Sequence, residues 1–101
     1  MNHNLYLKNI LDTAIKNNAS DIHFSEGYFP VFRINRKLVF WEKENIINAE
    51  DCKNIIFSLM TEEQIEEFLK EKEIDFSYNF EGRARFRVNV FFQMGAVSAS
   101  L

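Results

Sequence analysis

The sequence predicts an α+β domain in which helices flank an antiparallel sheet. Short segments that alternate apolar and polar residues fall into two groups, at about 21–40 and 73–101. Segments with apolar residues at helical spacing stand before and between these groups. Strands that follow one another without an intervening helix pair antiparallel, so this order favours the α+β class. The length of 101 residues suits one domain.

Three helices are expected, and each has local signals. The first covers residues 3–17, where apolar residues recur at helical spacing. The second begins near Asn48, a residue type that caps helix N-termini well. The T-E-E-Q run at 61–64 is a capping box and starts the third helix, which we expect to bury Ile65, Phe68 and Leu69.

The remaining segments read as strands separated by turns. Alternation predicts strands at 21–25, on either side of Asn35-Arg36, and at 73–78, 83–93 and 96–101. The last pattern runs to the final residue. We therefore expect residues 1–101 to be one domain of a longer protein, with a further domain after Leu101 that this chain does not contain.

Composition excludes several classes of function. A net charge of −3 and a pI near 5.4 argue against nucleic-acid binding driven by overall charge. No apolar run approaches the ~20 residues of a membrane span, so no direct membrane insertion is expected. The single cysteine, Cys52, excludes an internal disulfide and a cysteine zinc site. No G-x-x-x-x-G-K-[ST] motif is present, so we expect no ATPase activity and no cofactor for this chain alone.

The segment at 83–90 carries the clearest candidate site. In a strand, alternate side chains share a face, so Arg83, Arg85 and Arg87 are predicted to lie together, opposite an apolar face. Like charges at this spacing repel unless an anion or a carboxylate meets them. The planar guanidinium matches phosphate oxygens, which makes anion recognition one interpretation.

A surface charge ladder is the other interpretation. If 80–82 forms a three-residue hairpin loop with Gly82 in the left-handed conformation, Asp75 faces Arg87 and Glu73 faces Asn89 across the strand pair. Carboxylates on the neighbouring strand could then neutralise part of the arginine charge. The residues alone leave both interpretations open.

Asp21 and His23 form a second, weaker candidate. Together with Ser20 they have the residue types of a hydrolytic triad, but no activated nucleophile or oxyanion loop is visible. A metal site would need further ligands, because His3 and His23 are the only histidines, and none is predicted.

Five segments, in order, resemble the N-terminal domain of type IV pilus retraction ATPases of the PilT type. They are A-S-D-I-H-F-S at 19–25, P-V-F-R-I-N at 30–35, T-E-E-Q at 61–64, E-I-D-F-S-Y at 73–78 and R-F-R-V-N-V-F-F-Q at 85–93. The resemblance covers nearly the whole chain. It departs from the family pattern at Phe29-Pro30, where the family has Pro-Pro, and at Arg36, where it has Gly.

The resemblance implies a PAS-like fold with a curved sheet, followed in the parent protein by a RecA-like core that binds ATP and Mg. It also implies a homohexamer that drives pilus retraction and twitching motility from the cytoplasmic side of the inner membrane, at an inner-membrane platform protein. In such motors, arginines of this domain turn toward the nucleotide, and they map onto Arg85 and Arg87. Asp21 and His23 map near the contact with a neighbouring subunit's core.

Two other functions stay open at this stage. One is the matching domain of a type IV pilus assembly or type II secretion ATPase. The other is a free-standing PAS-like sensor or adaptor, which would need room for a small molecule.

Overall fold

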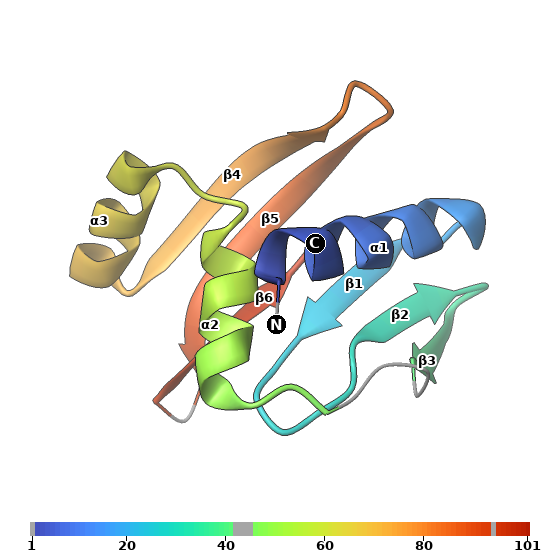
Figure 1. Cartoon of the computed structure of the whole chain (residues 1–101), viewed down its shortest axis with the longest axis horizontal. Helices are drawn as coiled ribbons and strands as arrows, with labels where there is room; N and C mark the ends of the chain where they lie inside the picture. The colour runs from blue at the N-terminus through green and yellow to red at the C-terminus, as the bar shows by residue number, and fades with distance from the viewer. Residues whose placement is uncertain (1, 42–45, 94) are drawn as a thin grey trace.

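The computed structural model describes residues 2–41, 46–93 and 95–101, and it folds them into one sheet with helices against it (Figure 1). In chain order the elements are α1 (His3–Lys16), β1 (Asp21–Phe24), β2 (Val31–Ile34), β3 (Lys37–Phe40), α2 (Ala49–Phe57), α3 (Glu62–Glu71), β4 (Glu73–Phe80), β5 (Ala84–Gln93) and β6 (Ala96–Ser100). The sheet has six strands in the order β3-β2-β1-β6-β5-β4, and its strand pairs are all antiparallel. The predicted α+β class with an antiparallel sheet is confirmed.

The helices begin where their capping residues predict. The Asn48 side chain accepts a hydrogen bond from the Asp51 amide and opens α2. At the start of α3 the capping box is complete. The Gln64 amide donates to Thr61 Oγ1 over 3.2 Å, and the Thr61 amide donates to Gln64 Oε1 over 2.9 Å. These bonds satisfy amides that the first helical turn leaves without partners.

The core lies between the helices and one face of the sheet. In Figure 1, α1 and α2 cross the sheet on the viewer's side and α3 stands beside β4. Phe68 of α3 is fully buried and stacks on Phe92 of β5, with ring centroids 4.8 Å apart. Leu69, which we expected to be buried, is 48% exposed, because α3 turns only its Phe68 side toward the sheet.

The other face of the sheet, called the open face below, carries the alternate residues of each strand. On β5 these are Arg85, Arg87, Asn89, Phe91 and Gln93, and on β1 they are Asp21 and His23. Among the described residues, no helix has the length and apolar character that crossing a membrane requires.

Candidate functional site

Arg85 and Arg87 lie on the open face, as the alternation of β5 predicts. Ala84 and Phe86 are half-buried and Val88 and Val90 fully buried on the opposite face, while both arginines are exposed. The apolar side chains hold the strand to the core. The two guanidinium groups are therefore presented to solvent from a fixed strand rather than from a mobile loop.

Arg87 has a carboxylate partner. Its Nη2 donates to Asp75 Oδ2 over 2.9 Å and its Nε donates to Asp75 Oδ1 over 3.3 Å. The hydrogen bonds from Arg87 lower the pKa of Asp75, and the same bonds raise the pKa of Arg87. Within the described ranges, no carboxylate lies within ion-pair distance of Arg85. The two arginines thus differ in charge compensation.

Arg83 does not join this pair, contrary to the sequence prediction. The hairpin loop is 81–83, with Phe80 paired to Ala84, so Arg83 belongs to the loop and not to the strand. Its guanidinium contacts Asp12 of α1 and lies over the Phe80 ring, 5.3 Å from the centroid. Gly82 has the expected left-handed conformation, with φ of +70°.

This loop shifts the register of the hairpin by two residues from the predicted one. Ser77 stands opposite Arg87 and Asp75 stands opposite Asn89. The contact between Asp75 and Arg87 forms all the same, because it runs diagonally between the strands, within reach of a long side chain. In the same way Asn89 Nδ2 donates to Glu73 Oε1 over 3.2 Å.

A polar depression of about 480 Å³ joins the two arginines to Asp21. Its lining also includes Ser20, Asp75, Asn89 and Ser100. Asp21 is not free there, since Arg33 Nε lies 3.4 Å from its carboxylate and Ser20 Oγ donates to it over 2.9 Å. The structure therefore brings together three of the four predicted site residues, Asp21, Arg85 and Arg87.

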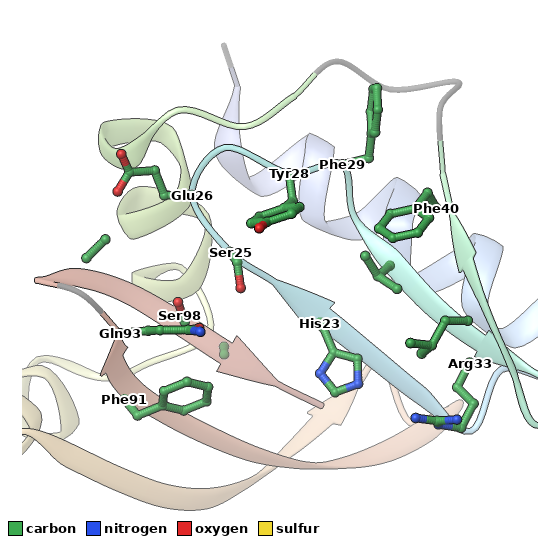
Figure 2. Close-up of a pocket in the computed structure, with 14 residues that line it drawn as sticks. His23, Ser25, Glu26, Tyr28, Phe29, Arg33, Phe40, Phe91, Gln93 and Ser98 are labelled. Atoms are coloured by element: carbon green, nitrogen blue, oxygen red, sulfur yellow. The ribbon is translucent and has the colours of Figure 1, made fainter.

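His23 lies in a separate groove of about 780 Å³ on the same face (Figure 2). Figure 2 shows His23 near the middle, Arg33 toward one end and Glu26 toward the other. Aromatic residues from several elements line it, namely Tyr28, Phe29, Phe40 and Phe91. Tyr28 and Phe40 are more than half exposed, at 58% and 51%.

The sequence prediction missed this groove. The signal was present in the adjacent Phe91 and Phe92, because neighbours in a strand point to opposite faces and only one of them can enter the core. Among the described residues, no three His, Cys, Asp or Glu side chains gather in the manner of a metal site.

Comparison with known proteins finds close relatives of this domain, while no family model matches. The type IV pilus retraction ATPase PilT of Pseudomonas aeruginosa is 33% identical over 86 residues, which are 83% of this chain and 24% of that protein. The type IV pilus ATPase PilU of the same organism is 25% identical over 92 residues, 91% of this chain and 24% of its own length. The chain thus spans about a quarter of the curated relatives that it matches.

A comparison with solved structures also finds PilT. The crystal structure of the pilus retraction motor PilT with bound ADP matches with a TM-score of 0.84 and 34% identity, over 92% of this chain and 27% of that one. The ATPase DotB of Legionella pneumophila matches with a TM-score of 0.79 over 96% of this chain and 28% of that one. At 24% identity, DotB shows the fold alone.

The sheet order, the helix-covered face and these matches define the class of protein: an α+β domain of the type IV pilus ATPases. Within that class, the chain belongs to the PilT-type ATPases by sequence, and it has the fold of their N-terminal domain. The resemblance stated from the sequence is confirmed.

Proposed function

We propose that this chain is the N-terminal domain of a hexameric type IV pilus retraction motor that drives twitching motility. In the proposed parent protein a RecA-like core follows Leu101 and binds ATP and Mg. The motor works in the cytoplasm, peripheral to the inner membrane, against a platform protein. The identity of 33–34% to the pilus retraction ATPase PilT supports the choice of a retraction motor.

In this proposal Arg85 and Arg87 approach the phosphates of a nucleotide held by the core. The observation that carries it is the exposed, uncompensated guanidinium of Arg85 beside Arg87 on one rigid strand. Two arginine side chains offer paired N–H donors and positive charge, which fit the oxygens of a phosphate chain. Negative charge that spreads over those oxygens during phosphoryl transfer is stabilised by such donors.

Asp21 and His23 are proposed to lie at the contact with a neighbouring subunit's core. Both are half-buried on the open face, where they are accessible to a partner. Asp21 also lies in the same depression as the two arginines, so a core that docks there would meet all three residues.

The groove around His23 favours the alternative, a sensor domain that binds a small molecule. A ligand site of a PAS-like sensor would require space inside the core, whereas here the large side chains of Phe24, Phe32 and Phe68 are fully buried in it. The groove is on the outer face of the sheet instead. We therefore favour the motor.

The test replaces the arginines in the longer protein that carries this domain. We expect Arg85→Ala and Arg87→Ala each to reduce ATP turnover by roughly 10³-fold, with little change in melting temperature because both side chains are exposed. Arg85→Lys keeps the charge and loses the planar fork, so it should remain impaired.

Lys53→Ala is the control, since it removes one half-buried cation, paired with Glu50, from α2 on the covered side of the sheet. Its turnover should stay normal. Normal turnover with a lowered melting temperature in the arginine variants would show a structural charge ladder and refute the nucleotide role.

A further inference from the structure

Arg85 and Arg87 are not equivalent binding partners for a phosphate chain. Arg85 has no carboxylate within ion-pair distance among the described residues, whereas Arg87 is held by Asp75 through two hydrogen bonds. A phosphate that arrives at this face therefore meets one guanidinium whose donors are available and one whose donors are partly engaged.

The contact with Asp75 occupies the donors that phosphate would use. Nε and Nη2 of Arg87 form one edge of the guanidinium, and both point at the two carboxylate oxygens of Asp75. Carboxylate and phosphate bind this edge in the same two-pronged manner. The same edge cannot bind both anions at once, so the phosphate must displace the carboxylate.

Displacement is feasible because the pair is exposed. The Arg87 side chain is 85% exposed and that of Asp75 is 46% exposed. Water screens such pairs, so they contribute little stability. A phosphate chain carries several negative charges and can replace a single carboxylate. An aspartate is ionised at neutral pH, and the hydrogen bonds from Arg87 lower the pKa of Asp75 further, so its carboxylate competes with phosphate.

We propose that Asp75 is a positioning residue that occupies the Nε–Nη2 edge of Arg87 until phosphate oxygens displace it. Arg85 is then the first arginine to contact a phosphate chain, and Arg87 binds phosphate only at a higher phosphate concentration. This inference rests on the proposed phosphate role of the two arginines. It adds to that role an order of engagement set by a residue of the domain itself.

Glu73 supplies a matched control on the same strand. It lies on the same face as Asp75, two residues earlier, and it accepts a hydrogen bond from Asn89 rather than from an arginine. Glu73→Gln therefore removes the same formal charge from the same surface without freeing any guanidinium. Comparison with Asp75→Asn separates release of Arg87 from a general change in surface charge.

The experiment titrates the 101-residue chain with inorganic triphosphate at constant ionic strength. The Nε–Hε NMR signals of Arg85 and Arg87 are followed separately. In the unmodified chain we expect Arg85 to respond at lower triphosphate concentration than Arg87. In Asp75→Asn the midpoint for Arg87 should fall by roughly 2- to 5-fold, which is the size expected for the loss of an exposed ion pair. Glu73→Gln should leave the order unchanged.

Three results would overturn the inference, and they have different meanings. If neither arginine responds to triphosphate, the proposed phosphate role fails along with it. If both respond together in the unmodified chain and in Asp75→Asn, only the order of engagement fails. If Glu73→Gln shifts the Arg87 midpoint as much as Asp75→Asn, the effect is one of overall charge. Asp75→Ser removes the same carboxylate and provides a second variant should Asp75→Asn fold poorly.

Discussion

Cys52 of α2 is a core residue whose chemistry is set by its burial. Its side chain is 0% exposed, and its Sγ lies 3.4 Å from the carbonyl oxygen of Val97 on β6. Burial raises the pKa of the thiol from 9.0 to about 11, and the negative charge of Glu26 adds to the shift. The thiol is therefore neutral and packs as a small apolar group.

This shift predicts a loss of stability at high pH. A pKa that is higher in the folded state stabilises the fold below pH 9, and that contribution disappears as the pH rises from 9 toward 11. The slope from this one group is at most about 1.4 kcal/mol per pH unit. Urea unfolding at several pH values would measure it. Cys52→Ala should show a shallower decline, and equal slopes for the two proteins would contradict the assignment.

At the scale of elements, the turn between β2 and β3 carries an unusual backbone. Ile34 pairs with Lys37, so Asn35 and Arg36 form a two-residue loop, and their φ values are +52° and +70°. This is the pattern of a type I′ turn, which matches the twist of hairpins and favours Asn followed by Gly. The Arg at the second position is strained, because its Cβ crowds the backbone there.

Arg36→Gly should therefore stabilise the domain. Relief of left-handed strain gains roughly 1–2 kcal/mol, and the greater freedom of Gly in the unfolded chain offsets roughly 0.5–1 kcal/mol of it. The hydrogen bond from Arg33 to the carbonyl oxygen of residue 36 involves only backbone at that site and can persist. Lys37→Gly, one residue on in a regular strand, should destabilise instead. Chemical denaturation compares them, and a loss of stability in Arg36→Gly would contradict the strain argument.

At the scale of the whole molecule, the two faces of the sheet differ: helices cover one, and the other is open. The helices and the apolar sides of the strands build the core on one face. The open face collects the arginines, Asp21 and the aromatic groove. β6 lies between β1 and β5 and joins the two halves of the sheet, so the two regions of the open face lie on one continuous sheet.

The chain alone should not turn over ATP. It holds arginines suited to phosphate but no glycine-rich loop to cradle a nucleotide, since the 3 glycines occur singly. Phosphate release in the presence of Mg and ATP, compared with a mock purification, measures this. Turnover that exceeds the mock and is abolished by Arg85→Ala would refute the expectation.

What the sequence determined by itself is local. The caps at Asn48 and Thr61 act over three residues, so the starts of α2 and α3 were predictable without knowledge of the fold. The alternation along β5 likewise assigned Arg85 and Arg87 to one face and Val88 and Val90 to the other. These features depend on bonds and periodicity within a few residues.

The tertiary structure decided the pairing of distant segments. A register shift of two residues keeps every side chain on its face, so alternation could not distinguish the predicted hairpin loop at 80–82 from the observed one at 81–83. As a result of that shift, Arg83 lies in the loop and contacts Asp12 of α1. Arg87 remains on the strand and contacts Asp75. The position of β6 and the groove around His23 also arise from contacts between strands far apart in sequence, where packing of the whole sheet selects the partner.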